Sequence, residues 1–441
     1  MTVIQNVLWL LVLIGVMILI HELGHFWAAR YFDVRVDVFS FGFGPRLFGF
    51  RKGETDYRFS AVLFGGYVKM AGEQPGDEHS DDPRGFLAKP RWQRMIIAFA
   101  GPIMNVVLAV GVLTGLYMVK YQKVIEPAIS GVIGYVTPDS PAAKAGIRAG
   151  DRIVKIDDKA YPNWEDISLK EGTNAHQALS VTIERDGKQF TVLVTPNLDD
   201  RTGMGMAGWS EQDQVQLGTI SPGMPADKAG LKKGDLILSA NGQPVRSVLR
   251  FHDTIRSSNG KPVTLDLERA GQKKTITVQP VFSKMDGPER WMIGAIVERK
   301  VKVETTRLSL PDALAESLRQ NYKGASLIYQ FLAKMLERNM SPKSITGPIG
   351  IAQLSGEAAR EGPSAFFMLM SMVSLNLAIF NLLPIPILDG GVIVMLLIEM
   401  LMRRDMSMQV KEAVFKVGFV FIMVIVAFVI YNDISKILPA G

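Results

Sequence analysis

Cysteine is absent from the 441-residue sequence, and histidine is scarce, with five residues. The absence of cysteine excludes disulfide frameworks and thiolate metal sites, so any metal ion must be bound by histidine, aspartate or glutamate. An excess of charge of one sign is also lacking, since 49 Lys and Arg stand against 43 Asp and Glu. The resulting formal charge of +6 gives no reason to expect nucleic acid as a partner.

Apolar sequence is what the chain has in abundance, at 48% of its residues. A helix needs about 20 apolar residues to span a bilayer, and four segments meet that length. No Lys or Arg precedes Arg30, so the first segment is interpreted as a retained span and not as a cleaved signal peptide. In the second segment, Gly111 and Gly115 form a pair of small residues suited to helix contact.

The third apolar segment, Ala365–Met402, is too long for one straight crossing. Pro384 and Pro386 interrupt it, so a broken helix is expected there. The chain is therefore predicted to be a polytopic α-helical membrane protein with four transmembrane segments, the third one broken. We expect these spans within residues 1–30, 94–120, 365–402 and 403–441.

Lys and Arg are concentrated in the connections between the first and second spans and between the third and fourth. The positive-inside rule places these connections in the cytoplasm, and both termini and residues 121–364 on the opposite side. Within that long stretch, residues 301–364 are predicted to be an amphipathic helical connector, with a helix over Pro311–Asn339.

Residues 31–93 cluster β-forming side chains around glycines, including Gly42 and Gly44 on either side of Phe43. This pattern predicts β-hairpins in a membrane-associated cytoplasmic region. A hairpin that only packs on the rest of the protein is the alternative.

An internal repeat lies in the long stretch after the second span. Gly134–Val154 matches Gly218–Leu238, 84 residues later, with ten identities in twenty-one positions. Each copy is predicted to contain a strand, a short helix that begins at Pro141 or Pro225, and a further strand after Gly-Asp. The pattern resembles PDZ domains, which bind an extended chain at a sheet edge. We expect two tandem PDZ-like α+β domains, at 121–214 and 215–300; inert spacers are the alternative.

The first apolar segment ends in His21-Glu22-Leu23-Gly24-His25. Histidines at i and i+4 lie on one helix face and can reach a single Zn²⁺ ion, and the Glu beside the first can act as general base. The other histidines, His79, His176 and His252, lie in segments predicted to be soluble. The alternative is that the three polar groups sit at the lipid headgroups, because Arg30 follows about 13 Å along the helix.

A catalytic zinc ion also needs a third protein ligand. The ionisable residues inside the remaining spans are Asp389, Glu399 and the peripheral Lys416, and Asp389 is the natural choice. Pro384 and Pro386 precede it, and a helix broken in hydrocarbon is tolerated only where protein or a water-filled cavity surrounds the freed backbone groups. Hydrolysis requires such a cavity.

Four features together resemble the site-2 protease family of intramembrane zinc metalloproteases. They are HELGH, the sequence GPIMN at Gly101–Asn105, the sequence NLLPIPILDGG at Asn381–Gly391 and the tandem repeats. The resemblance implies that His21, His25 and Asp389 bind zinc and that Glu22 activates the attacking water. It implies further that Asn376 and Asn381 contact substrate, with Pro384 and Pro386 beside them and the hairpin residues Gly42, Phe43 and Gly44 clamping the substrate chain.

The resemblance also implies a cellular context. The substrate would be a single-span membrane protein of the anti-sigma-factor type, already shortened by another protease, in an envelope stress response. The chain would lie in a bacterial inner membrane, with the repeats and both termini in the periplasm and the active site toward the cytoplasm. A substrate tail would bind at the PDZ-like grooves. Two other functions stay open: a metal transporter, and a membrane-anchored PDZ scaffold without proteolytic activity.

Overall fold

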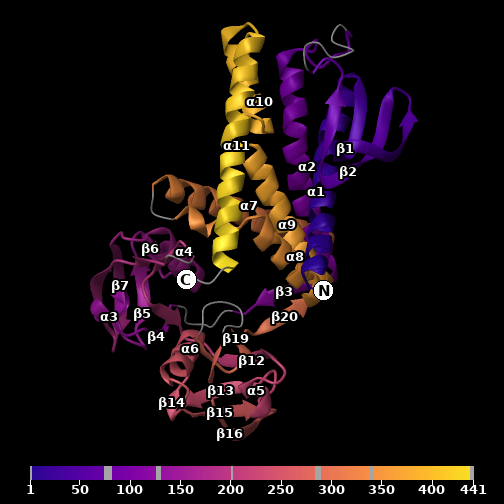
Figure 1. The fold of residues 1–441 in the computed structure, drawn as a ribbon. Helices are drawn as coiled ribbons and strands as arrows, with labels where there is room; N and C mark the ends of the chain where they lie inside the picture. The colour runs from indigo at the N-terminus through magenta and orange to yellow at the C-terminus, as the bar shows by residue number, and fades with distance from the viewer. Residues whose placement is uncertain are drawn as a thin grey trace. The chain divides into compact units, whose positions relative to one another are not determined.

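The computed structural model describes residues 2–73, 82–125, 131–199, 202–283, 290–337 and 341–437. The predicted soluble residue His79 lies outside these ranges. The chain divides into two compact units. The first comprises Met1–Tyr121, Thr305–Gln330 and Thr346–Ile434, and the second Gln122–Glu304, Phe331–Ile345 and Ser435–Gly441. Each unit is described by itself (Figure 1).

Four helices among the described residues are long and apolar enough to cross a membrane, as the sequence predicts. They are α1 (Thr2–Tyr31), α2 (Arg91–Val119), α9 (Pro363–Asn381) and α11 (Met408–Ile437). In the first unit α2 packs against both α1 and α9 (Figure 1). Two serine hydroxyls of α9 fasten it to α2, since Ser371 Oγ donates to Ala109 O at 2.9 Å and Ser374 Oγ to Asn105 O at 2.8 Å.

The third apolar segment is broken as expected. After α9 ends, residues 382–388 are not helical, and the chain resumes in α10 (Asp389–Met402), a helix of 14 residues. Pro384 and Pro386 lie in the break, where a proline can neither donate a backbone hydrogen bond nor continue the preceding helix. Ile387 has φ +84°, a left-handed conformation that is rare and strained for a β-branched residue.

The close contact between α1 and α2 is made by glycines other than the predicted pair. A Cβ added at Gly24 of α1 would lie 2.3 Å from Ala100 O of α2, so only glycine fits there. At Gly111 and Gly115 an added Cβ would meet no described atom within 4 Å. The prediction of a helix contact at Gly111 and Gly115 is therefore wrong within the described part of the chain, because the close approach occurs nearer the N-terminal end of α2.

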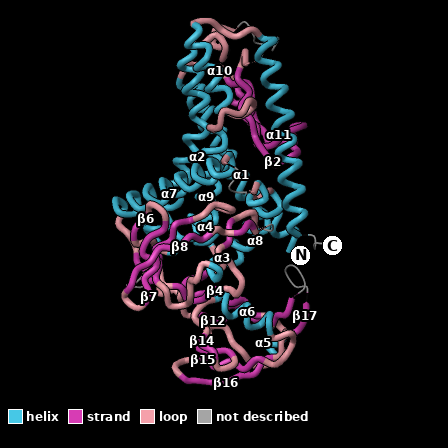
Figure 2. The backbone as a smooth tube through the Cα atoms, turned by 90° about the vertical axis from the view of Figure 1, so that its left-hand side faces the viewer, coloured by secondary structure: helices cyan, strands magenta, loops and turns pink. Residues whose placement is uncertain are grey.

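Residues 31–93 contain one long hairpin, β1 (Val36–Lys52) and β2 (Thr55–Met70). Part of β1 pairs with two different parts of β2. The first part of β1 pairs with both ends of β2: Phe41 lies opposite Gly66 and also opposite Phe59. The bend occurs near Gly42, where φ is +97° and a side chain would clash with the carbonyls of the neighbouring strand. The strands curl back beside α1 (Figures 1 and 2).

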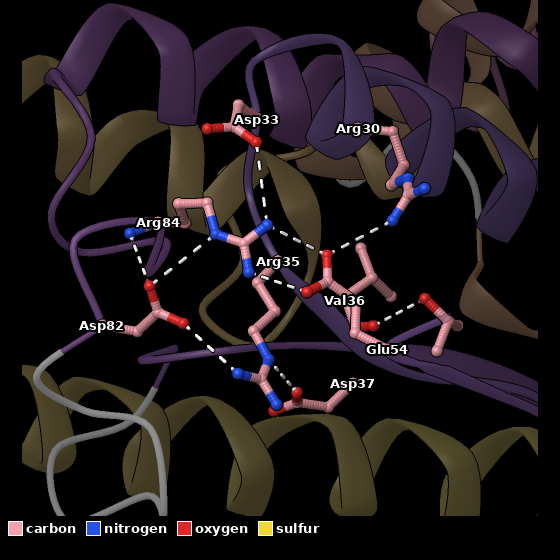
Figure 3. Close-up of polar contacts among 9 residues, drawn as sticks. Arg30, Asp33, Arg35, Val36, Asp37, Glu54, Asp82 and Arg84 are labelled. Atoms are coloured by element: carbon pink, nitrogen blue, oxygen red, sulfur yellow. Dashed lines mark hydrogen bonds and ion pairs between the residues drawn. The ribbon is translucent and has the colours of Figure 1, made fainter. Parts of the chain in front are cut away.

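Ion pairs fasten this hairpin to the end of α1, where Arg30 lies 3.5 Å from Glu54, and to the segments beside it (Figure 3). Arg84 donates to both carboxylate oxygens of Glu54 in the hairpin turn, at 3.1 and 2.7 Å. Arg35, where the chain leaves α1, contacts Asp37 at 2.9 Å and Asp82 at 3.4 Å. The hydrogen bonds from Arg84 hold the pKa of the Glu54 carboxyl below its ordinary value. These contacts thus fix the position of the hairpin turn between β1 and β2.

The connector before the third span contains two helices where one was predicted. They are α7 (Leu310–Leu336), which covers most of the predicted Pro311–Asn339, and α8 (Pro348–Glu361), which was not predicted; a 3₁₀ turn, η1, lies at Pro342–Ser344. Asn339 lies outside the described residues. The buried Asp433 of α11 accepts hydrogen bonds from the amides of Gly347, Ile349 and Gly350 at 2.8–3.1 Å. A carboxylate at a helix N-terminus is favourable, so Asp433 fixes the start of α8.

The second unit contains the two repeats, each with its own hydrophobic core. The first repeat comprises β4 (Ile133–Val136), α3 (Pro141–Lys144), β5 (Arg152–Ile156), β6 (Lys159–Ala160), α4 (Trp164–Thr173), β7 (Leu179–Arg185), β8 (Lys188–Val194), β9 (Asn197–Leu198), β10 (Gly205–Met206) and β11 (Trp209–Glu211). The second comprises β12 (Val215–Ile220), α5 (Pro225–Lys228), β13 (Leu236–Ala240), β14 (Gln243–Pro244), α6 (Val248–Ser257), β15 (Val263–Arg269), β16 (Gln272–Val278), β17 (Val281–Ser283), β18 (Arg290–Met292) and β19 (Ala295–Arg299). Strands β3 (Tyr121–Val124) and β20 (Val303–Thr306) pair with each other outside the repeats.

The two repeats share their strand order, but the corresponding strands form one continuous sheet in the second repeat and two separate sheets in the first. In the second, the order is β16-β15-β13-β12-β19. In the first, the corresponding strands form a sheet β6-β5-β7-β8 and a separate pair β11-β4. The strand, short helix and strand predicted for each copy are therefore present in both.

Each repeat is also stabilised by a matching buried ion pair. Arg185 binds Asp151 through two hydrogen bonds of 2.6 and 2.7 Å, and Arg269 binds Asp235 through two of 2.6 Å. Both aspartates are about 1% exposed. The aspartate of the Gly-Asp sequence thus anchors the end of a strand 34 residues later in both copies.

Candidate metal centre

His21, His25 and Asp389 come together in the first unit. His21 Nε2 lies 3.2 Å from His25 Nε2 and 3.2 Å from Asp389 Oδ2, and His25 Nε2 lies 3.4 Å from Asp389 Oδ1. A tetrahedral zinc ion with bonds of about 2.0–2.1 Å separates its ligand atoms by about 3.3–3.4 Å. The three side chains therefore fit three corners of a zinc site and leave the fourth for water or substrate. Among the described residues, no second group of three His, Asp or Glu side chains is close enough to share an ion.

The tautomer of His25 is set by α2. His25 Nδ1 lies 2.8 Å from the carbonyl oxygen of Ile97, and both groups are buried. Only the N–H form of Nδ1 can donate to a carbonyl, so the neutral imidazole keeps its lone pair on Nε2, which faces Asp389.

Asn105 of α2 holds the other imidazole. Its amide lies 3.2 Å from His21 Nδ1, and its side chain is fully buried. With Asn105 Nδ2 toward the imidazole, the amide oxygen Oδ1 has no hydrogen-bond partner among the described residues. Turning the amide by 180° would aim Oδ1 at a His21 Nδ1–H and free Nε2 for a metal ion, which would satisfy both groups. The orphaned Oδ1 thus supports an imidazole that binds metal through Nε2.

Gly101 of α2 leaves room for both imidazoles. A Cβ added there would lie 2.3 Å from His25 Nε2 and 2.8 Å from His21 Cε1. Such distances are shorter than van der Waals contact, so a residue with a side chain would displace the imidazoles. Sequence reasoning used Gly101 and Asn105 only as parts of a family motif; their spacing of four on one helix was the signal for a shared face toward the histidines.

Asp389 is the first residue of α10. Its position depends on the break before it, because the two glycines that follow touch the backbone of that break: a Cβ at Gly390 would lie 2.2 Å from Leu383 O, and one at Gly391 would lie 2.4 Å from Ile385 O. A carboxylate in the first turn of a helix is favoured by the helix dipole.

Glu399, the other acidic residue of this segment, has a structural role and is not a metal-ligand candidate. It is 1% exposed, and its carboxylate contacts Lys411 Nζ at 2.7 Å, the Met406 amide at 3.0 Å and Arg94 at 3.9 Å. Arg94 lies on α2 and Lys411 on α11. Glu399 therefore fastens the end of α10, and through α10 the position of Asp389, to the helix that orients both imidazoles.

Glu22 lies between the two histidines and the hairpin. Its carboxylate lies near the backbone of Val68 in β2. A Cβ added at Gly66 of β2 would lie 3.3 Å from Glu22 Cγ. The candidate base is half-buried beside the metal ligands and next to a strand.

The other predicted site residues are placed as follows. Asn376 lies within α9 and Asn381 is its last residue; both are half-buried, and five positions on one helix set them on different faces. Pro384 is exposed and Pro386 half-buried in the break. Phe43 is 46% exposed, with its ring stacked parallel to Tyr67 at 6.1 Å. Gly42 and Gly44 flank it with positive φ. No measured contact joins these residues to the three metal-ligand candidates within the described chain.

Comparison with known proteins decides the family. The profile of peptidase family M50 matches residues 9–425. The chain belongs to this family. Its membership confirms the resemblance to the site-2 proteases and identifies the chain as a metalloprotease.

Several relatives align with this chain over nearly its full length. The regulator of sigma-E protease RseP of Salmonella typhimurium is 29% identical over 99% of this chain and 100% of its own. The protease RseP of Yersinia pestis is 30% identical over 98% of this chain and 100% of its own. A Treponema pallidum protein whose name includes the words zinc metalloprotease is 32% identical, over 96% of this chain and 97% of its own.

Proposed function

We propose that this chain is a zinc-dependent endopeptidase that cleaves a peptide bond within or near the transmembrane segment of a single-span membrane protein. The observation that carries the proposal is the convergence of two imidazoles and one carboxylate from two apolar helices, at the ligand spacing of a tetrahedral zinc ion. A charged side chain at the centre of a membrane costs about 2.5–3.5 kcal/mol on insertion scales. A structural zinc ion returns about 10–16 kcal/mol in small peptides, which offsets that cost.

His21, His25 and Asp389 would hold the ion. When bound, zinc would supply a Lewis acid that polarises the scissile carbonyl and makes a water nucleophilic near neutral pH. Glu22 would take the proton of the attacking water and deliver it to the leaving nitrogen. Its place beside the two histidines and next to β2 supports that role.

The substrate would bind as an extended chain beside β2. A transmembrane helix hides its peptide bonds, and pairing with a strand edge keeps an unwound segment open. The carboxamides of Asn376 and Asn381 can each satisfy a peptide N–H and C=O of such a segment. Gly42, Phe43 and Gly44 would clamp the substrate at the bend of the hairpin. The exposed apolar side chains of that hairpin, such as Leu47, Phe48 and Phe50 at 62–64%, support contact with lipid.

The names of the relatives support a role in regulated intramembrane proteolysis, with an anti-sigma-factor type of substrate in an envelope stress response. The chain would lie in a bacterial inner membrane, with the repeats and both termini periplasmic and the metal centre toward the cytoplasm. The repeats at 121–214 and 215–300 would act as PDZ-like modules that bind a substrate tail.

The test is the Glu22→Gln variant of the purified protein, with a single-span peptide as substrate and metal analysis of the same sample. Cleavage should vanish while one zinc ion per chain stays bound, because glutamine keeps the shape of Glu22 and cannot accept the proton. His21→Ala should lose both metal and cleavage. If Glu22→Gln cleaves at the wild-type rate, Glu22 is not the general base; if the zinc-loaded wild type does not cleave, the protease assignment fails, and a transporter or a scaffold becomes the better interpretation.

A further inference from the structure

Two serine hydroxyls of α9 donate to the backbone of α2, one helical turn apart. Ser374 Oγ donates to the carbonyl oxygen of Asn105 at 2.8 Å, and Ser371 Oγ donates to that of Ala109 at 2.9 Å. All four residues are buried, with exposures of 2% or less. The hydroxyls lie three positions apart on α9 and their acceptors four positions apart on α2, so both bonds connect the same two helix faces.

A serine in an apolar helix can instead satisfy its hydroxyl on the carbonyl four residues earlier in its own helix. Ser355 of α8 does so, donating to Ile351 O at 2.7 Å. Ser371 and Ser374 donate across to α2. Because a hydroxyl without a partner is costly in an apolar interior, these two bonds favour one register of α9 on α2.

The two acceptor residues have different neighbours. The side-chain amide of Asn105 lies 3.2 Å from His21 Nδ1, in the metal centre. Ala109 has only a methyl group, which lies in an apolar cluster with Leu375 and Ile379. The two bonds are thus alike in length and burial, but of the two it is the bond from Ser374 that ends on a residue in contact with a metal-ligand candidate.

The backbone of Asn105 determines where its amide can lie. An asparagine side chain has two rotatable bonds, and that of Asn105 is fully buried, so the amide has few alternative positions. A small shift of the Asn105 backbone therefore moves the amide relative to the His21 imidazole. The Ser374 hydroxyl opposes such a shift because it binds the carbonyl of the same residue.

We propose that Ser374 is a positioning residue of the metal centre. Its hydroxyl fixes the backbone of Asn105, and the Asn105 amide in turn orients the His21 imidazole so that Nε2 faces the ion. Ser374 lies outside the HELGH, GPIMN and NLLPIPILDGG sequences. The inference rests on the proposed zinc site and extends its support to a third helix, α9.

The first test compares the zinc affinities of two alanine variants of the full-length protein, measured by chelator competition in detergent. A hydrogen bond between membrane helices is worth a factor of about 3 on average and about 20 at most. Ser374→Ala should therefore bind zinc about 3- to 10-fold more weakly than wild type. Ser371→Ala loses an equivalent bond one turn away and is the matched control, with an affinity expected within about twofold of wild type. Equal zinc affinities in the two variants would overturn the assignment.

Thermal unfolding of the metal-free protein separates positioning from general stability. Each alanine variant loses one buried hydrogen bond, so both should lower the unfolding temperature by a similar amount. Ser374→Thr keeps the hydroxyl and should keep the zinc affinity within about twofold of wild type. A loss in Ser374→Thr as large as that in Ser374→Ala would show that packing and not the hydrogen bond is responsible, which contradicts the proposal.

The route through Asn105 is tested by combining variants. Asn105→Leu removes the amide that Ser374 is proposed to position, so adding Ser374→Ala should lower the zinc affinity by less than about twofold further. If the double variant shows the whole additional loss of about 3- to 10-fold, Ser374 does not act through Asn105 and the proposal is wrong.

These measurements involve no cleavage. Equal zinc affinities of the two alanine variants would remove the role of Ser374 and leave the protease proposal standing. A zinc-loaded wild type that does not cleave a single-span peptide would refute the protease proposal and leave the comparison of affinities valid, so the two proposals fail separately.

Discussion

Gly101→Ala inserts a single methyl group between the two imidazoles of the metal centre. The added Cβ would lie 2.3 Å from His25 Nε2. Ordinary contact between such atoms begins at about 3.4–3.5 Å, so the imidazole must move by about 1 Å. A displacement of that size at a reacting centre costs about 100-fold in rate, and disturbed support of metal ligands costs about 10–100-fold in metal affinity.

The same helix provides the matched control. At Gly111, ten residues further along α2, an added Cβ meets no described atom within 4 Å. Glycine costs about 1 kcal/mol relative to alanine in a helix interior, so both substitutions favour the helix itself by a similar amount. Gly111→Ala should therefore keep wild-type zinc content and activity and unfold at the same or a slightly higher temperature. The difference between the two variants isolates the contact with the histidines.

The assay combines zinc content after equilibration with a graded series of chelator concentrations and the initial rate of cleavage of a single-span peptide. We expect Gly101→Ala to fall by about two orders of magnitude in kcat/KM and by one or more in zinc affinity, with circular dichroism unchanged. Wild-type zinc affinity and rate in Gly101→Ala would refute the placement of α2 against the imidazoles.

Three further outcomes follow from contacts described above. Asn105→Leu fills a similar volume without a hydrogen-bond acceptor and should lower zinc affinity about 10–100-fold in the same chelator titration, with little change in unfolding temperature. Glu399→Gln removes the charge that Lys411 contacts at 2.7 Å, while Arg94 keeps its bond to Asp405, so it should cost about 1.5–3 kcal/mol of stability, seen in thermal unfolding; a change below about 1 kcal/mol would show that the ion pairs do not fasten α10. Burial alone would raise the pKa of Asp235, but the hydrogen bonds from Arg269 hold it below its ordinary value, so this pair contributes stability above about pH 4 that is lost as the pH falls further. Exchange protection of the second repeat should therefore drop below pH 4 in wild type and be low at every pH in Arg269→Met; an unchanged profile in the variant would argue against the pair.

Much of the candidate site could be predicted because its signal is local. Histidines at i and i+4 must share a face of a helix, whatever the helix packs against. Asp389 could be predicted as the third metal ligand because few ionisable residues occur in the apolar segments. The partners of the imidazoles could not be found this way, because Asn105 and the Ile97 carbonyl reach them only through the packing of α2 on α1.

The fold shows the same division between local and long-range information. The spans and the strand-helix-strand order of the repeats were predicted from patterns within a few residues. The glycine pair Gly111 and Gly115 was misread because a small-residue spacing says where two helices could approach and not where a partner lies. Helix α8 was missed because its start depends on Asp433, a residue 85 positions after Pro348. The double pairing of β1 with β2 likewise depends on tertiary contacts.

The contact between Gly24 and Ala100 determines which part of the molecule can move. With no space for even a methyl group at this contact, α1 and α2 cannot separate or slide without losing it, so the imidazole pair and its supporting carbonyl and amide form one rigid body. Asp389 lies on a short helix attached through the proline-containing residues 382–388. A displacement of α10 would therefore draw the Asp389 carboxylate away from the two imidazoles. The affinity of the three side chains for a metal ion would thus fall whenever α10 moves away from α2.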